Sequence, residues 1–220
     1  ATVTYHINIA KGVDCSLFKL VVEQPQLWKV IVNGIPVNAI QGEWWLDKSF
    51  GVYHAGKALR EGENKVVLDI SPTSIFAEIQ PIYLTGDFHL SPAAQGWLVE
   101  RPEHSLTLGS WKQQGLPFYS WDIAYSQHFN ISDPKATYEI QLTDWDGTVS
   151  EVFVKGESTG IIAYQPYKLD VSKWIRKGDN QIEVRVMGSH RSLLGPHHNK
   201  TAQGISGPWH WQKVSGEMPA

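Results

Sequence analysis

Two adjacent histidines, His197 and His198, stand near the C-terminal end of the sequence, a few residues after His190. Imidazole side chains bind transition metals and exchange protons near neutral pH, so either kind of site could lie here. A zinc site needs three or four ligands, however, and adjacent side chains on an extended segment point to opposite faces. The two histidines therefore cannot chelate one ion from a strand. We interpret residues 193–198 as a turn that closes a β-sandwich, and we keep both histidines among the candidate ligand-binding residues.

Aromatic side chains are the second group with chemistry to offer, with 10 Trp, 8 Tyr and 7 Phe in 220 residues. An exposed ring stacks on the apolar C–H face of a sugar, while nearby polar groups bind its hydroxyls. Three segments gather such groups, and the candidate sugar-binding residues in them are Trp44, Trp45, Trp111, Gln114, Tyr119, Trp121, Trp209 and Trp211. Because Trp44 and Trp45 are neighbours, at most one of them can face the core from a strand. Packing between domains is the alternative use of each segment.

Acid–base catalysis on a glycoside needs two carboxyl groups roughly 5 to 10 Å apart across a cleft. The sequence offers scattered candidates, which are Glu43, Asp47, Asp87, Glu100, Asp144 and Asp146. The last two belong to "DWDG", which is typical of a turn in which Asp accepts local backbone hydrogen bonds. We therefore assign no catalytic residue. No metal or cofactor is predicted either, because structural calcium needs several oxygen ligands and no loop is dense enough in carboxylates.

The charge balance argues against nucleic acid as a partner. The 19 basic and 22 acidic residues give a formal net charge of −3, and no Lys/Arg cluster could neutralise a run of phosphates. No stretch approaches the roughly 18 to 20 consecutive apolar residues of a membrane span. Cys15 is the single cysteine, so no internal disulfide can form. The chain opens on alternating residues without the features of a signal peptide, and we expect a soluble protein that is either mature or cut from something longer.

Strand signals dominate the chain. Short runs rich in β-branched and aromatic residues are bounded by Gly, Pro, Asn or Asp, and they lie at 4–9, 17–22, 28–32, 64–70, 79–84, 138–143, 150–154 and 181–186. Helical periodicity is scarce, with room for about one turn each in 55–62 and 170–178. The sequence therefore predicts an all-β protein built as sandwiches.

An internal repeat organises these strands. "WKVIVNG" (28–34) matches "SEVFVKG" (150–156), and residues 57–70 match residues 172–186. In the second pair, the glycine and asparagine of "GEN" and "GDN" correspond, and each pair is expected to supply positive-φ positions to a tight turn. We predict two tandem β-sandwiches, residues 1–92 and 93–220, the first short or incomplete and truncated at its N-terminus.

The second copy resembles the sugar-binding, jelly-roll domain of family-2 glycoside hydrolases, through "VFVKG", "PYKLDV" (166–171) and "GDNQIEVRV" (178–186). The segment 109–131, with "QGLPFY", and "LLGPHH" are similar to accessory β-sandwiches of α-L-rhamnosidase-like bacterial glycosidases. The resemblance implies galactose-binding-like jelly rolls. The catalytic barrel of these enzymes, about 250 residues long, has no counterpart here, so none of its catalytic glutamates can be assigned.

These observations favour a non-catalytic carbohydrate-binding or accessory module of a larger polysaccharide-degrading enzyme. Its expected partners are plant or algal polysaccharide and the catalytic domain of the parent enzyme, and its expected location is secreted or periplasmic, in a bacterium. Two alternatives remain open. The chain could be a small hydrolase or lyase using His and carboxylate acid–base catalysis, which requires such a pair in a cleft. It could also be a structural brace between domains, with Trp44, Trp111 and Trp209 buried.

Overall fold

The computed structural model describes residues 1–145 and 147–194. Its regular structure is nearly all β, which confirms the predicted fold class. The chain divides into two compact units, residues 1–116 (unit 1) and 117–220 (unit 2). These units are defined by how the chain packs and do not test the domain boundary that the sequence predicts after residue 92. That boundary stays a prediction. No helix within the described residues is long and apolar enough to cross a membrane.

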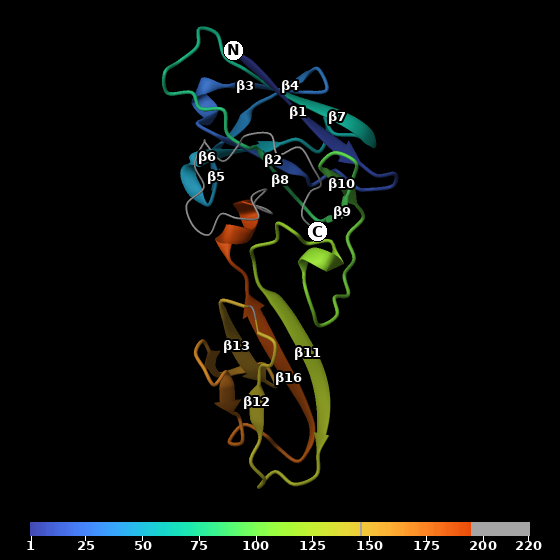
Figure 1. Cartoon of the computed structure of the whole chain (residues 1–220), viewed down its shortest axis with the longest axis vertical. Coiled ribbons are helices and arrows are strands. Elements are labelled where there is room, and N and C mark those ends of the chain that lie inside the picture. Colours follow the sequence, from blue (N-terminus) through green and yellow to red (C-terminus); the bar gives the residue numbers. More distant parts are fainter. Residues whose placement is uncertain (146, 195–220) are drawn as a thin grey trace. The chain divides into compact units, whose positions relative to one another are not determined.

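Unit 1 consists of two sheets, whose strands are labelled in Figure 1. Its elements are β1 (Thr2–Ile9), β2 (Lys19–Glu23), the 3₁₀ turn η1 (Pro25–Leu27), β3 (Lys29–Val32), β4 (Ile35–Val37), β5 (Ala39–Trp45), β6 (Asp47–His54), β7 (Gly62–Asp69), β8 (Tyr83–Thr85), β9 (His89–Pro92), β10 (Trp97–Glu100) and η2 (Lys112–Gln114). One sheet has the order β4-β3-β7-β1-β10-β9, and the other has the order β5-β6-β2-β8.

The two sheets of unit 1 share one hydrophobic core. Alternating residues of each strand point to the same face, so Val66 and Leu68 of β7 enter the core together. Leu20 and Val22 do the same from β2, in the other sheet. All four side chains are at most 3% exposed, as expected for a β-sandwich interior.

One strand of unit 1 comes from beyond the predicted join at residue 92. β10 pairs in parallel with β1, with Asn8 opposite Leu98, and β9 pairs with β10. The first sandwich is predicted from the sequence to be short or incomplete. With β10 included, it has a six-stranded and a four-stranded layer around its own core.

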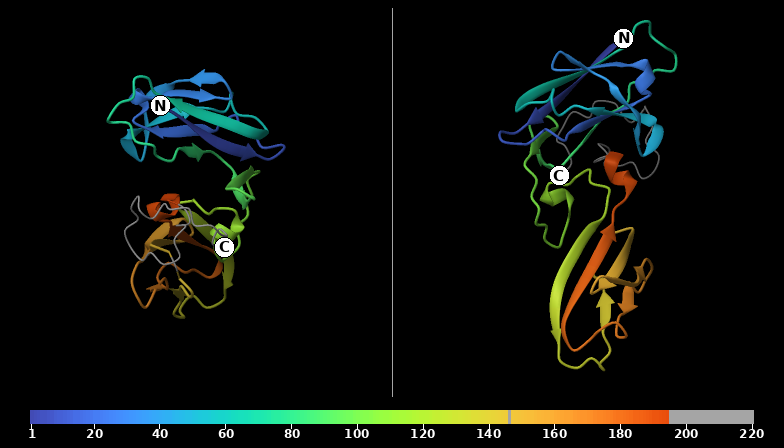
Figure 2. Two further views of the ribbon diagram at one scale, coloured as in Figure 1. Left: turned by 45° about the horizontal axis from the view of Figure 1, so that its top comes forward. Right: turned by 180° about the vertical axis from the view of Figure 1, so that it is seen from behind.

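Unit 2 is built around one long strand pair. Its described elements are β11 (Ile123–Ile131), β12 (Glu139–Gln141), β13 (Val149–Val154), β14 (Glu157–Ile162), β15 (Lys168–Asp170), β16 (Gly178–Met187) and η3 (His190–Leu194). The main sheet has the order β11-β16-β13-β14, and β12 pairs with β15. Figure 2 shows β11 and β16 side by side. The core holds Val152, Val154, Ile162, Val171 and Ile175.

The predicted repeat is present in the structure. The hairpin β3–β4 turns at Asn33 and Gly34, with φ of 51° and 84°, and the hairpin β13–β14 turns at Lys155 and Gly156, with φ of 53° and 81°. Two consecutive positive φ angles are typical of the two-residue turns that match the twist of paired strands. The two sequence copies therefore form the same local structure.

The sequence predicted positive φ at both the glycine and the asparagine of "GEN" and "GDN", and the prediction is wrong for the asparagine. Gly62 and Gly178 do have positive φ, of 84° and 91°, whereas Asn64 and Asn180 do not. Each asparagine is instead the third residue of its strand, and its side chain is completely buried. Its function is therefore to bind the preceding loop, through its amide group.

The repeat also extends further than the sequence comparison found. "HINI" (6–9) in β1 and "HFNI" (128–131) in β11 occupy the same register, because Ile9 lies opposite Gly62 and Ile131 lies opposite Gly178. Four residues with one substitution are too short a match to be found without the strand pairing. Each unit thus contains an equivalent antiparallel strand pair, β1–β7 in unit 1 and β11–β16 in unit 2.

Candidate functional site

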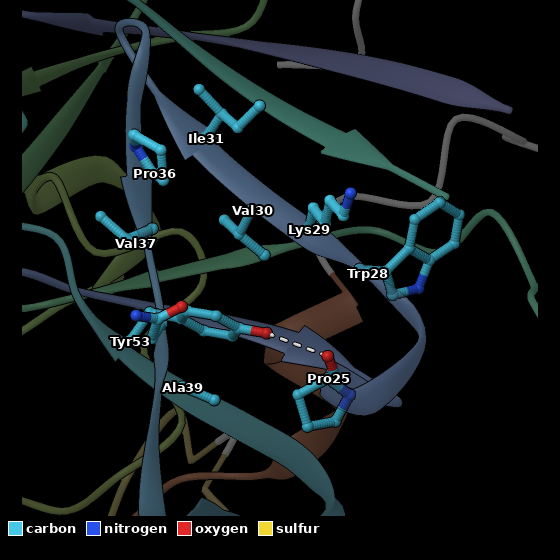
Figure 3. Close-up of a pocket in the computed structure, with 10 residues that line it drawn as sticks. Pro25, Trp28, Lys29, Val30, Ile31, Pro36, Val37, Ala39 and Tyr53 are labelled. Atoms are coloured by element: carbon cyan, nitrogen blue, oxygen red, sulfur yellow. Dashed lines mark hydrogen bonds between the residues drawn. The ribbon is translucent and has the colours of Figure 1, made fainter. Parts of the chain in front are cut away.

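A cavity lies in unit 1 where the chain crosses from one sheet to the other. Val37 of β4 is still paired with Val30 of β3, whereas Ala39, two residues later, is paired with Tyr53 of β6 in the second sheet. The crossing leaves a space of about 370 Å³ between β3, the β4–β5 segment and η1, shown in Figure 3. This volume falls in the lower part of the range for small-molecule sites, roughly 300–1,000 Å³.

The cavity has a buried apolar side and an exposed mouth. Trp28, Val30 and Tyr53 are at most 9% exposed and form its floor. The exposed lining residues are Lys29, Pro36, Asn38 and Ala39, and the partly buried ones are Pro25, Ile31 and Val37. A ligand with an apolar face and a polar edge fits this distribution.

Tyr53 is fixed against the η1 side of the cavity. Its hydroxyl is directed at Pro25 and donates a long hydrogen bond, of 3.4 Å, to the Pro25 carbonyl oxygen (Figure 3). Gly51, two residues earlier on β6, allows this packing, since a Cβ there would lie 2.5 Å from Pro25 Cγ. Burial raises the pKa of Tyr53 to about 12. The tyrosine therefore stays neutral and can act as a hydrogen-bonding group at any physiological pH.

This raised pKa predicts a loss of stability at alkaline pH. A tyrosine in the unfolded chain ionises near pH 10, and Tyr53 in the folded unit ionises near 12, so its contribution is complete below pH 10 and is lost as the pH rises to 12. We expect the free energy of unfolding to fall by about 2–3 kcal/mol across that window from this group. Urea unfolding measured at several pH values checks it.

The control for this prediction is Tyr53→Phe, which keeps the ring and removes the ionising group. Tyr5 and Tyr83 also have pKa values raised by burial, so both proteins will lose some stability at high pH. The difference between wild type and Tyr53→Phe isolates the one residue. Equal losses in both proteins would contradict the assignment.

Of the aromatic residues predicted from the sequence, Trp44 lies on the same sheet face as the cavity. It pairs with Gly51 across β5–β6, and Gly51 and Tyr53 are two residues apart on one strand. Trp44 is 51% exposed. Trp45 is half-buried and packs against Tyr83, with ring centroids 5.1 Å apart. The doublet therefore places one indole in solvent, on the same sheet face as Tyr53, and one in an aromatic pair.

The other described candidates have structural contacts elsewhere. In unit 1, Trp111 is half-buried beside η2, and the Gln114 amide binds the backbone of Thr107, accepting at 2.8 Å and donating at 3.1 Å. In unit 2, the Tyr119 hydroxyl donates to a backbone carbonyl, and the 50% exposed Trp121 ring contacts the His190 ring. Trp209, Trp211, His197 and His198 lie outside the described residues.

Sequence reasoning missed the cavity floor, although the repeat contained a signal for it. Trp28 and Lys29 begin the first copy of the repeated strand, and Ser150 and Glu151 hold the same positions in the second copy. The following valines and the Gly turn are retained in both copies. A change from serine and glutamate to tryptophan and lysine within an otherwise similar strand marks a position where the two units differ in chemistry.

The histidine–carboxylate pairs in the structure lie on strand surfaces. His6 Nδ1 is 2.8 Å from Glu63 Oε1, and the equivalent His128 Nδ1 is 2.9 Å from Asp179 Oδ2. The hydrogen bond from His6, and then the charge of Lys65, lower the pKa of Glu63. Among the described residues, no histidine or carboxylate lines the cavity, and no three His, Cys, Asp or Glu side chains are grouped to hold a metal.

Comparison with known proteins relates the chain to glycosidases. No family model matches the sequence. The chain is 25% identical over 131 residues to the curated sequence "Putative beta-glucuronidase" of Formosa agariphila, and the match covers 53% of this chain and 10% of that protein. The chain therefore spans about a tenth of the length of this relative.

Two solved structures are also similar, at low TM-scores. The first is a rhamnosidase from Novosphingobium sp. PP1Y, with a TM-score of 0.34 and 16% identity; the similarity covers 91% of this chain and 22% of that protein. The second is an α-L-rhamnosidase from Streptomyces avermitilis complexed with L-rhamnose, with a TM-score of 0.31 and 13% identity; the similarity covers 85% of this chain and 22% of that protein. The chain is thus similar to parts of much longer glycosidases.

Proposed function

We propose that the chain is a carbohydrate-binding accessory module of a glycosidase, which holds glycan in the cavity of unit 1 with Trp44 as a stacking platform. The observation that carries the proposal is the half-exposed Trp44 on the same sheet face as Tyr53, which lines the cavity. An exposed indole beside an apolar cavity with a polar mouth is the combination that binds the apolar and polar sides of a sugar.

Binding at this site involves stacking and hydrogen bonds without a covalent step. The exposed Asn38 amide is available to sugar hydroxyls, and the apolar floor excludes water from the C–H face. The hydrolase alternative requires a histidine and a carboxylate in the cleft, and the described lining residues include neither. The brace alternative would be favoured by Trp44 buried at a domain seam, and within this chain Trp44 is 51% exposed.

The proposal includes the finer expectations from the sequence. The ligand is a plant or algal polysaccharide or oligosaccharide, and the protein partner is the catalytic domain of the parent enzyme. The two units are galactose-binding-like jelly rolls, and the protein is secreted or periplasmic in a bacterium. Support comes from the sequence resemblance and from the similarity to a segment of the Formosa agariphila relative.

The test compares Trp44→Ala with Trp121→Ala, because these two tryptophans are 51% and 50% exposed. Wild-type protein is titrated calorimetrically with a panel of soluble plant and algal oligosaccharides. We expect Trp44→Ala to weaken binding about tenfold, through the loss of one stacked ring. Trp121→Ala, in unit 2, should bind as tightly as wild type.

Unchanged thermal unfolding of both variants confirms that the fold is intact. Absence of binding by wild type across the whole panel would contradict the function. Binding that survives Trp44→Ala would show that glycan is held elsewhere and would overturn the assigned site.

A further inference from the structure

The chemistry of the cavity mouth points to a particular class of sugar. Among the described lining residues, Lys29 is the single charged side chain and no carboxylate is present, although the whole chain has a net charge of −3. We infer that the cavity takes an anionic sugar residue, bearing a carboxylate or a sulfate ester, with Lys29 as its counter-charge. This inference rests on the proposed function and specifies the ligand of the same site.

Lys29 has no ion-pair partner among the described residues. Lys19 pairs with Glu43, and Lys168 pairs with Glu139 at 2.8 Å, but no carboxylate lies within 4.0 Å of the Lys29 ammonium. Asp69 lies directly opposite Lys29 on β7. The Asp69 carboxylate instead accepts a hydrogen bond of 2.7 Å from the Thr2 hydroxyl. The ammonium is therefore available to an external anion.

The second copy of the repeat lacks this arrangement. Glu151 holds the position of Lys29, and its carboxylate accepts a hydrogen bond of 2.6 Å from the Ser158 hydroxyl. Ser150 holds the position of Trp28 and is completely buried. In unit 2 a carboxylate therefore replaces the ammonium group, and a serine replaces the tryptophan ring that forms the floor in unit 1. The inference therefore assigns anion binding to unit 1 alone.

The geometry separates the apolar and charged parts of the ligand. Figure 3 shows Trp28 and Lys29 on the β3 side of the cavity and Pro36 and Val37 on β4. A sugar ring at the mouth, where the chain leaves β3 after Val37, places its C–H face against the apolar floor. Neighbouring residues of a strand point to opposite faces, so Lys29 approaches the mouth from the side of β3 opposite to Val30. Because Lys29 is exposed, its anion stays partly hydrated, which keeps the cost of removing charge from water low. A lysine at the mouth favours an anionic sugar over its neutral counterpart.

The experiment uses ¹H–¹⁵N NMR of the full chain with three probes: methyl glucuronoside, glucose 6-sulfate and methyl glucoside. We expect saturable shifts of the Trp28 indole N–H and the Asn38 amide with an anionic probe, and about tenfold weaker binding of methyl glucoside. Lys29→Met keeps the apolar stem and removes the charge. It should reduce affinity for the anionic probe to that of the neutral one.

Three further variants sharpen the result. Lys29→Arg should retain binding, and Asp69→Asn, which removes the opposing charge, should tighten it. Lys57→Met removes another exposed lysine of unit 1 that does not line the cavity, and it should change nothing. Added salt should weaken the anionic probes and leave methyl glucoside unaffected.

The outcomes separate this inference from the proposed function. Binding of glucuronoside alone, or of the sulfate alone, supports the inference and identifies which anion is held. Equal affinities for charged and neutral probes, unchanged in Lys29→Met, would overturn the inference while glycan binding stands. No binding of these probes or of the oligosaccharide panel would overturn both.

Discussion

Replacing Asn64 by alanine is expected to lower the free energy of unfolding of unit 1 by about 2–4 kcal/mol. The completely buried amide accepts the Arg60 N–H at 2.9 Å and donates to the carbonyl oxygens of Arg60 and Gly62, at 2.7 and 3.0 Å. Its oxygen also accepts from Asn33 Nδ2 at 2.8 Å. Alanine leaves these groups buried without partners and opens a cavity, and both effects destabilise the folded state.

The repeat provides a twin variant for this prediction. Asn180 makes the same three backbone bonds, at 2.9, 2.7 and 2.8 Å, to the residues four and two positions before it. Asn180→Ala should therefore destabilise unit 2 by a similar amount. Urea unfolding, monitored by amide exchange in each unit, measures both effects. Asn130→Ala, at an exposed position, is the control and should change stability little.

An aspartate at position 64 tests the bonding pattern itself. Asn64→Asp preserves the shape but replaces the donating amide group with an oxygen that faces the carbonyl oxygens of Arg60, Gly62 and Ile7. We expect it to be at least as destabilising as alanine above pH 5, where a carboxyl group is normally ionised. A loss below about 0.5 kcal/mol in either variant would show that the asparagine is not needed to hold the loop.

The sequence predicted strands whose composition and periodicity agree. It missed strands that contain glycine (β5, β6 and β14) and strands without it (β4, β9, β10, β11 and β15). Every run singled out from the sequence overlaps an observed strand, and the two expected helical turns are single turns, as in Leu59 N–H to Ala55 O. β5 was missed. It contains Gly42, and its register with β6 is irregular, so its alternation is broken.

The candidate site was predictable only at its rim. The Trp44–Trp45 doublet requires that the two rings face opposite sides of a strand, so an exposed indole could be expected from spacing alone. The cavity depends on where β4 leaves β3 to join the other sheet, and no local pattern specifies that crossing. Trp28 and Lys29 look like ordinary strand residues until the two copies are compared in register.

Asn64 and Asn180 also show that a role which depends on the path of the folded chain cannot be predicted from local sequence. Sequence spacing correctly identified Gly62 and Gly178 as positive-φ positions, because backbone conformation is a local property. The amide of Asn64 acts on a loop whose path depends on the packing of β7 between β1 and β3. Residue type alone suggested a turn former, and only the three-dimensional path reveals a buried hydrogen-bonding group.

Gly56→Ala should destabilise unit 1 by about 3 kcal/mol, because the new Cβ has no space. A Cβ at Gly56 would lie 2.3 Å from the Cys15 carbonyl oxygen and 2.4 Å from that of Ser16. Backbone atoms cannot rotate away as a flexible side chain can. The equivalent residue of unit 2 is Ser172, so the turn itself accepts a side chain. The cost in unit 1 must come from the approach of the β1–β2 loop.

The chain's single cysteine reports whether that loop is displaced. Cys15 is buried at 9% exposure, and burial, followed by the charges of Asp14 and Glu61, raises the pKa of its thiol, so labelling of the folded protein should be slow. Gly56→Ala should accelerate thiol labelling under native conditions as well as lower the unfolding midpoint in urea. Asn180→Ala is the matched control, since it destabilises unit 2 and should leave Cys15 labelling unchanged. Destabilisation of Gly56→Ala without faster labelling would show that the strain is absorbed in the turn after β6, and that the 15–16 backbone keeps its place.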